Sequence, residues 1–333
     1  MSTLPCTSNF TYFDTPDFLL HALHVLTAIS TPIYCLGVYC ILLKTPEAMK
    51  SVKWYLFTLH FWILIFDYYV CLLTVPYLLI PEIAGIPYGV LRYLGVPTSF
   101  QTIAGVIVLA YMFTSNASIF ENRFFILCQF PGKRFWASLR RAWLAYHYFI
   151  ILVCFIPVFY LIPDQEEAKE SVLKRLPCLP DYIYSAPVFV LATDFTYHIL
   201  FSGGGIAALC SETGFFITML IWNGRSQQKS KTISQKTYQM HKQFLIALVI
   251  QMSIPLVMLI LPVMYGYVSI LLTHWNQGAI NGCVVIAMSH GFLSTVVMIV
   301  VHKPYRLAVK AMIMKGDEEI RMQRKSTVLS VQL

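Results

Sequence analysis

The sequence predicts an all-α protein whose helices cross a membrane seven times as a single bundle. Of its 333 residues, 57% are hydrophobic and only 12% are charged, whereas an average soluble domain has about 25% charged residues. The mean hydropathy is +0.65. Because so few charges cannot cover so much apolar surface in water, the chain is expected to lie in a lipid bilayer.

Seven apolar runs are each long enough for a transmembrane helix, which needs about 20 residues. They cover residues 18–43, 54–80, 99–121, 143–162, 196–222, 244–272 and 280–302. Residues 1–17 are polar and lack the basic start of a secretory signal peptide, so the first run is expected to be retained. The chain therefore divides into an N-terminal segment 1–17, a seven-helix domain 18–302 and a tail 303–333.

Lys and Arg residues are concentrated in alternate connections, which predicts the orientation of the bundle. Of the 24, 20 fall after the first, third and fifth runs or in the tail, and 4 fall in the other connections. Cytoplasmic loops carry the excess of basic residues, so the N-terminus is expected outside and the C-terminus in the cytosol. No soluble basic domain carries the net charge of +8, which argues against nucleic acid as a partner.

Three residues near the expected outer surface suggest covalent modification. Asn9 begins the glycosylation sequence Asn-Phe-Thr, although so short a sequence also arises by chance. Cys6 and Cys178 are the two cysteines on the oxidising side, which predicts a disulfide between them. The alternative is two free thiols that share one face of the membrane.

Two acidic residues lie inside predicted spans, where an unpaired charge is costly. Asp67 is in the second run, seven residues after His60, and we expect polar partners for it such as Ser289 or Asn281. Glu212 is in the fifth run with no evident basic partner. For Asp67 a buried polar switch or packing role explains the residue better than catalysis, which would need a water path and further ligands. Glu212 could line an ion path, but one acid without a matching basic partner is little evidence for it.

No metal site or cofactor is predicted. The spacings His21–His24 and Asp194–His198 would suit a metal. Both pairs lie near the expected outer interface, where such residues are common, and an intramembrane metal enzyme needs several ligands from different helices. We therefore expect no enzymatic activity.

The cytosolic end of the third run and the interior of the sixth run carry features typical of a switch. Glu121, Asn122 and Arg123 follow one another at the end of the third run, where the acid and the base were expected to form a local pair. The alternative is ordinary anchoring of Arg123 at the membrane interface. Pro255 and Pro262 each remove a backbone hydrogen bond from the sixth run, which predicts bends there.

A corner is predicted where the seventh run ends. Pro304, Tyr305 and Arg306 interrupt the apolar run, and Leu307, Ala311 and Met314 then recur at helical spacing beside basic residues. This pattern predicts a short amphipathic helix over about 305–315 that lies on the inner membrane surface.

The ordered set of these motifs resembles the nematode serpentine chemoreceptors of class H, within the seven-transmembrane plan of G protein-coupled receptors. The resemblance rests on Lys44-Thr45-Pro46, Trp54-Tyr55-Leu56, Glu121-Asn122-Arg123-Phe124, Leu176-Pro177-Cys178 and His302-Lys303-Pro304-Tyr305-Arg306. It covers nearly the whole chain. The chain departs from rhodopsin-like receptors, since it lacks their Asn-Pro-x-x-Tyr and Cys-Trp-x-Pro patterns.

The resemblance implies a chemosensory receptor in the plasma membrane of sensory cilia, coupled to a heterotrimeric G protein. A small environmental or pheromone-like ligand would then bind among the outer halves of the spans, and Glu121, Asn122, Arg123, Pro304, Tyr305 and Arg306 would serve coupling. Candidate ligand contacts are Gln101, Tyr111, His198, Tyr265 and Asn281. A ligand-gated channel or a transporter is the alternative, and whether the receptor acts alone or as an oligomer stays open.

Overall fold

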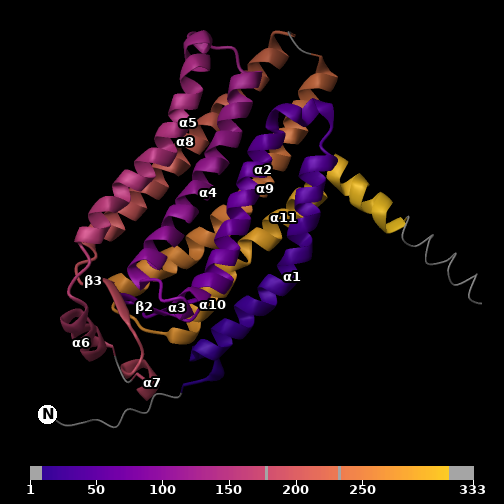
Figure 1. The fold of residues 1–333 in the computed structure, drawn as a ribbon. Coiled ribbons are helices and arrows are strands. Elements are labelled where there is room, and N and C mark those ends of the chain that lie inside the picture. Colours follow the sequence, from indigo (N-terminus) through magenta and orange to yellow (C-terminus); the bar gives the residue numbers. More distant parts are fainter. Residues whose placement is uncertain (1–9, 177–178, 232–233, 315–333) are drawn as a thin grey trace, which may run out of the picture.

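Seven long helical segments form the body of the computed structural model (Figure 1). The structure describes residues 10–176, 179–231 and 234–314. Within this part of the chain, seven segments are long and apolar enough to cross a membrane: Pro16–Leu43, Lys50–Thr74, Thr98–Leu127, Lys133–Tyr160, Thr196–Lys229, Gln235–Leu271 and Gln277–Val301. They confirm the predicted seven-helix bundle.

The crossings run antiparallel along the chain and define two ends of the bundle. They are α1 (Pro16–Leu43), α2 (Lys50–Tyr68) with its π-helical continuation η3 (Tyr69–Thr74), α4 (Thr98–Leu127), α5 (Lys133–Tyr160), α8 (Thr196–Lys229), α9 (Gln235–Leu271) and the pair α10 (Gln277–Met288) and α11 (His290–Val301). We call the end with the connections after α1, α4 and α8 the basic end. The opposite end, where α1 begins, is the N-terminal end (Figure 1).

Four helices extend further at the basic end than their apolar runs. Helix α4 continues to Leu127 rather than 121, and α5 starts at Lys133 rather than 143. Helix α8 continues to Lys229 rather than 222, and α9 starts at Gln235 rather than 244. The extra residues are rich in Lys, Arg and Gln, which are good helix formers. Helices therefore continue past the apolar part of the sequence.

The second crossing ends earlier than the predicted range 54–80. Val75, with φ of 41°, follows η3 in a left-handed conformation, and Pro76 begins a strand instead of another helical turn. Proline has no N–H to donate to a helix, so the chain changes direction here. Residues 75–80 are thus corrected from helix to the start of a β-hairpin.

A three-stranded antiparallel sheet at the N-terminal end was not predicted. Strand β1 (Pro76–Leu78) pairs with β2 (Ile83–Pro87), and β2 pairs with β3 (Phe189–Ala192) from a connection about a hundred residues later. Short helical turns surround it: η1 (Tyr12–Asp14), α3 (Val90–Tyr93), α6 (Gln165–Arg175) and α7 (Asp181–Tyr184). Together they cover the N-terminal end of the bundle (Figure 1).

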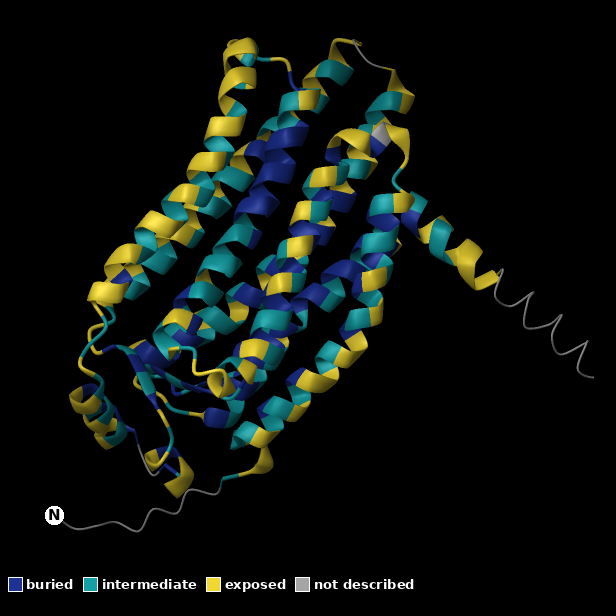
Figure 2. Cartoon of the chain, in the orientation of Figure 1, coloured by how far each residue is buried: buried dark blue, intermediate teal, exposed yellow. Residues whose placement is uncertain are grey.

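Helix α4 lies at the centre of the bundle and α5 at its edge. Half of the apolar window of α4 is buried, against 6% for α5 and 11% for α8. Figure 2 shows the same contrast, with buried residues along α4 and exposed ones along α5. In a membrane the exposed apolar side chains of α5, such as Phe149 and Ile156, would face lipid.

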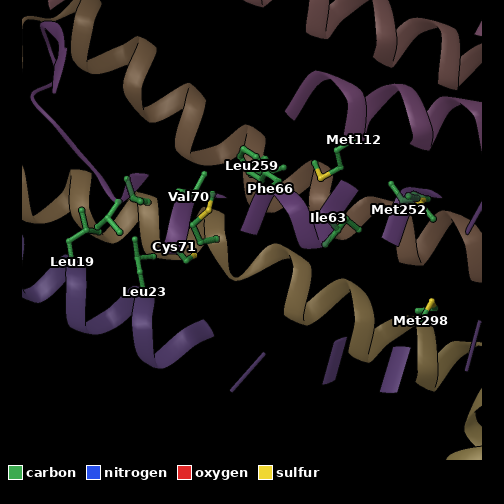
Figure 3. Close-up of a cluster of buried hydrophobic side chains, with 14 of the residues drawn as sticks. Leu19, Leu23, Ile63, Phe66, Val70, Cys71, Met112, Met252, Leu259 and Met298 are labelled. Atoms are coloured by element: carbon green, nitrogen blue, oxygen red, sulfur yellow. The ribbon is translucent and has the colours of Figure 1, made fainter. Parts of the chain in front are cut away.

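Apolar side chains from most of the crossings pack together in the bundle interior. Figure 3 shows part of this cluster, including Leu19, Leu23, Ile63, Phe66, Val70, Cys71, Met112, Met252, Leu259 and Met298. Between helices in lipid the hydrophobic effect is weak, so dispersion contacts and close approach hold such a cluster together. Gly291 of α11 permits one close approach, because a Cβ there would overlap Asp67 and Tyr34.

The chain turns sharply after the seventh crossing. Helix α11 ends at Val301, His302 has an extended conformation, and residues 303–314 form a further helix that leaves the bundle at an angle (Figure 1). This is the short helix expected from about 305. The predicted Cys6–Cys178 disulfide and the glycosylation of Asn9 lie outside the described residues, and the other seven cysteines are free.

Candidate functional site

Glu121 pairs with Arg140 of α5 rather than with its neighbour Arg123. Its Oε1 accepts hydrogen bonds from Arg140 Nε at 2.8 Å and Trp136 Nε1 at 2.7 Å, and its Oε2 accepts one from Arg140 Nη2 at 2.8 Å. Residues two apart on a helix point in different directions, so the expected local pair does not form. The two-pronged contact instead fixes the basic-end part of α5 against α4.

Asn122 joins this contact to α2. Its Oδ1 accepts a hydrogen bond from Arg140 Nη2 at 3.0 Å, and its Nδ2 donates to the carbonyl oxygen of Ser51 at 3.0 Å. Glu121 and Asn122 are both buried. They therefore act as a clamp between α2, α4 and α5.

Arg123 points away from that clamp and has no carboxylate partner among the described residues. Its side chain is 7% exposed, and its guanidinium carbon lies 4.0 Å above the ring centroid of Phe244 in α9. Its Nε has no hydrogen-bond acceptor in this part of the structure. A desolvated cation over an aromatic face is attracted by the ring, although less strongly than by a carboxylate.

His302 and Tyr305 complete the group around Arg123. The His302 ring lies 5.6 Å from that of Phe244 and 5.5 Å from that of Tyr305, and its Nε2 lies 3.0 Å from Gln251 Oε1. We call Arg123, Phe244, His302 and Tyr305 the arginine stack. Burial and the charge of Arg123 lower the pKa of His302 to about 4, so this imidazole is neutral near pH 7.

Tyr305 also connects the stack to the first crossing. Its side chain is fully buried, and its hydroxyl lies 2.8 Å from Thr45 Oγ1. Pro304 is half-buried beside it, and the exposed Arg306 donates from Nη1 to the carbonyl oxygen of Val300 at 2.9 Å. Of the six predicted coupling residues, Arg123 and Tyr305 belong to the stack, where Phe244 and His302 lie between them, whereas Glu121 and Asn122 face α5.

Asp67 has different partners from those expected. The hydroxyl of Tyr34 in α1 donates to its Oδ2. Nδ1 of His290 lies 3.5 Å from its Oδ1 but only 2.8 Å from the carbonyl oxygen of Ala287, so Oδ1 has no hydrogen-bond partner among the described residues. Ser289 instead donates to its own helix, and Asn281 lies at the N-terminal end. The expected partners Ser289 and Asn281 are wrong because the packing of α1 against α2 places Tyr34 beside Asp67, and the sequence alone does not reveal this packing.

The surroundings of Asp67 link three crossings. His60 Nε2 lies 3.2 Å from the carbonyl oxygen of Tyr34, so both polar residues of α2 contact the same residue of α1. A narrow pocket next to them has room for about one water molecule. Its lining comprises Leu26, Thr27, Ser30, Tyr34, Asp67, Tyr68, Cys71 and Met288.

Glu212 has partners that the sequence did not reveal. Its Oε2 lies 3.2 Å from Nε2 of His147, and its Oε1 accepts a hydrogen bond from Trp143 Nε1 at 3.0 Å. Both partners lie on α5, one turn apart. Glu212 therefore ties α8 to the edge helix α5.

The five candidate ligand contacts engage separate neighbours. Gln101 donates from Nε2 to the carbonyl oxygen of Val96, and Tyr111 packs its ring 5.0 Å from Trp62. The ring nitrogens of His198 have no hydrogen-bond partner among the described residues, and Tyr265 is half-buried in α9. The structure does not bring these residues into one shared contact.

Asn281, the fifth candidate, lies under the N-terminal segment. Its Nδ2 donates to the carbonyl oxygen of Phe13 at 2.9 Å. Tyr77 of β1 and Gln277 of α10 lie in the same region, and neither was identified from the sequence. Tyr77 was missed because residues up to 80 were assigned to the second helix.

The two prolines at which bends are predicted lie within a single continuous helix. Pro255 and Pro262 both lie inside α9, which runs as one helix from Gln235 to Leu271. Among residues 10–176, 179–231 and 234–314, no group of three or more His, Cys, Asp or Glu side chains could hold a metal ion.

Comparison with known proteins gives two concordant matches. The family model described as "Serpentine type 7TM GPCR chemoreceptor Srh" matches residues 14–315. A curated relative, "Serpentine receptor class H-72" of Caenorhabditis elegans, is 27% identical over 307 residues, which cover 90% of this chain and 86% of the relative. The family match extends over all seven crossings.

Proposed function

The chain belongs to the Srh family of serpentine seven-transmembrane chemoreceptors, and we propose that it binds a small environmental or pheromone-like ligand and activates a heterotrimeric G protein. The family is one of receptors rather than enzymes. The match does not favour the alternative of a ligand-gated channel or transporter. By the same family relationship, the receptor would act in the plasma membrane of sensory cilia.

We place the basic end in the cytosol and the N-terminal end outside. The sequence between the apolar runs at the basic end, together with residues 303–333, holds 20 of the 24 Lys and Arg residues. The excess of basic residues in cytoplasmic loops supports this orientation. The covered N-terminal end would then face the ligand, and the arginine stack would face the G protein.

The arginine stack is the observation that carries the coupling proposal. Arg123 is buried without a carboxylate partner, and Phe244 of α9 covers its guanidinium group. A buried cation that lacks an acceptor is costly, so an arriving protein that offers acceptor groups would be favoured to take Arg123 from the ring. Pro255 and Pro262 lie further along α9 than Phe244, so a bend at either proline would move the part of α9 that carries Phe244 and uncover Arg123.

The ligand would act by shifting the population between covered and uncovered states of Arg123. Such a shift requires that the ligand bind one state of the bundle more tightly than the other. Asp67 and its contacts with α1 and α11 lie between the two ends and offer a route for the coupling. A route through packed side chains is a hypothesis that rests on these contacts.

The coupling proposal is tested with Arg123→Ala in a ligand-independent nucleotide-exchange assay with purified G protein. Loss of the cation should lower basal exchange by about tenfold, which is about 1.4 kcal/mol of coupling free energy. Arg141→Ala, which removes the same charge from an exposed position of α5, serves as the matched control. Unchanged exchange by a correctly inserted Arg123→Ala receptor would contradict the proposal.

A further inference from the structure

The N-terminal segment 10–15 lies over β1 and α10 at the N-terminal end, where its main-chain carbonyl groups hold it. Asn281 Nδ2 of α10 donates to the carbonyl oxygen of Phe13 at 2.9 Å and to that of Thr15 at 3.4 Å. The Tyr77 hydroxyl of β1 donates to the carbonyl oxygen of Asp14 at 2.7 Å. Three consecutive carbonyl oxygens of the segment thus accept hydrogen bonds from side chains beneath it.

The donor side chains beneath the segment are removed from solvent. Tyr77 and Asn281 are fully buried, and Gln277 is 1% exposed. Gln277 Nε2 donates to the carbonyl oxygen of Leu78 and to Asn281 Oδ1, both at 3.0 Å, so it holds Asn281 in position. A buried donor that loses its acceptor is strongly unfavourable. These donors therefore need an acceptor in any state of the receptor.

The segment itself has little side-chain burial. No residue of η1 is buried, and the side chains of Tyr12 and Phe13 are 53% and 59% exposed. Its detachment would break the ring contacts of Phe10 with Trp275 and of Phe13 with Phe18, at 5.8 Å and 5.1 Å. It would also leave the buried donors beneath it without acceptors, which is the larger cost for a donor that cannot reach water.

We propose that residues 10–15 are an intramolecular plug that occupies the place of the ligand. The ligand carries carbonyl oxygens, which accept the hydrogen bonds that Asn281 and Tyr77 donate to Phe13 and Asp14 in the plugged state. The inference rests on the proposed function, because it assumes a ligand on this side of the membrane. It narrows the ligand class to ketones, esters, lactones or similar acceptors. A hydrocarbon offers no acceptor, and an ammonium group only donates.

The geometry allows the plug to be locked in the full-length receptor. A Cβ built at Gly278 lies 3.7 Å from Cβ of Phe13, within the range of about 3.5–4.5 Å that disulfides favour. The double variant Phe13→Cys/Gly278→Cys should therefore form a disulfide between η1 and α10. The same protein after reduction, and each single variant, serve as matched controls.

The test measures hydrogen–deuterium exchange of the plug in purified receptor. The Asp14 and Thr15 amides are hydrogen-bonded within the single turn of η1, which would not persist once detached. The probes are a panel of methyl ketones and alkyl esters, with alkanes and alkylamines of equal chain length as controls. In the reduced variant, ketone or ester should speed exchange of these amides at least roughly fivefold, whereas the disulfide form and the control probes should show no change.

Two outcomes would overturn the proposal: no carbonyl compound changes the exchange, or alkanes and amines change it equally. Tyr77→Phe provides a variant without an engineered disulfide, and loss of its donor should raise basal exchange of the plug and weaken the ketone effect. If Tyr77→Phe changed neither the basal exchange nor the ketone effect, the buried donors would not hold the plug and the proposal would also be overturned. Because the readout involves no G protein, a positive exchange result without signalling would reject the proposed coupling while supporting the plug.

Discussion

His302 lies just beyond the end of the seventh crossing, where its protonation would disturb the arginine stack. It is 2% exposed, its ring packs between Phe244 and Tyr305, and its pKa is lowered from 6.5 to about 4 by burial and by Arg123. A second positive charge beside Arg123 would repel it. The neutral imidazole is therefore the form that fits the closed stack.

We predict that acidification opens the stack. Because the pKa in the closed stack is depressed, the stabilisation is complete above about pH 6.5 and declines as the pH falls from 6.5 towards 4. At pH 5 the loss is about 2 kcal/mol. Basal nucleotide exchange should then rise between pH 7 and pH 5 in inside-out membrane preparations.

The control for this prediction is His302→Gln, which can still hydrogen-bond to Gln251 but does not titrate. The ratio of wild-type to variant exchange removes the pH dependence of the G protein itself. A ratio that stays constant from pH 7 to pH 5 would show that His302 does not respond to protons in this range.

At the scale of elements, close approach between helices is concentrated at a few glycines. Gly291 lies in the first turn of α11 beside Asp67, and a Cβ at this position would lie 2.8 Å from Ile63 Cγ2 and overlap the Tyr34–Asp67 hydrogen bond. By contrast, a Cβ at Gly282 of α10 would meet no atom within 4 Å. The two glycines thus offer a matched pair within one crossing.

We predict that Gly291→Ala destabilises the receptor by about 1–3 kcal/mol, because an added methyl group in a packed interior forces neighbours apart. Gly282→Ala should leave stability unchanged or slightly higher, since alanine favours a helix. Thermal unfolding of both variants in nanodiscs measures the difference. Equal melting temperatures would mean that α11 can shift away from Asp67 without loss.

The sequence predicts the helical elements well because an apolar run of about 20 residues can satisfy its backbone in lipid only as a helix. The same criterion cannot recognise β1, since Tyr77 and Leu78 are as apolar as the helix before them. The contacts that site residues make with other helices are harder to predict from the sequence. Position on α4 indicates that Arg123 lies at the basic end, but only the approach of α5 and α9 pairs Glu121 with Arg140 and Arg123 with Phe244.

At the scale of the whole molecule, the two ends differ in both charge and construction. The N-terminal end is closed by a sheet, short helices and residues 10–15, whereas the basic end consists of helix ends, short connections and the helix over 303–314. Under the proposed function, the covered N-terminal end would select the ligand. At the basic end, movement of α9 would then expose Arg123 to the G protein.

These differences predict a single topology, with residue 1 outside the cell and residue 333 inside. An epitope tag at the N-terminus should be stained on intact cells, and a tag at the C-terminus only after permeabilisation. Basic residues set this orientation. A variant in which Lys229, Lys236 and Lys242 are replaced by Gln, and Ser185 and Thr193 by Lys, should therefore contain a detectable fraction of inverted molecules. Replacing the same three lysines by Arg keeps the charge and is the control. If a C-terminal tag of the unmodified receptor were accessible on intact cells, the arginine stack would lie outside the cell. That result would contradict the proposal that the stack contacts a G protein.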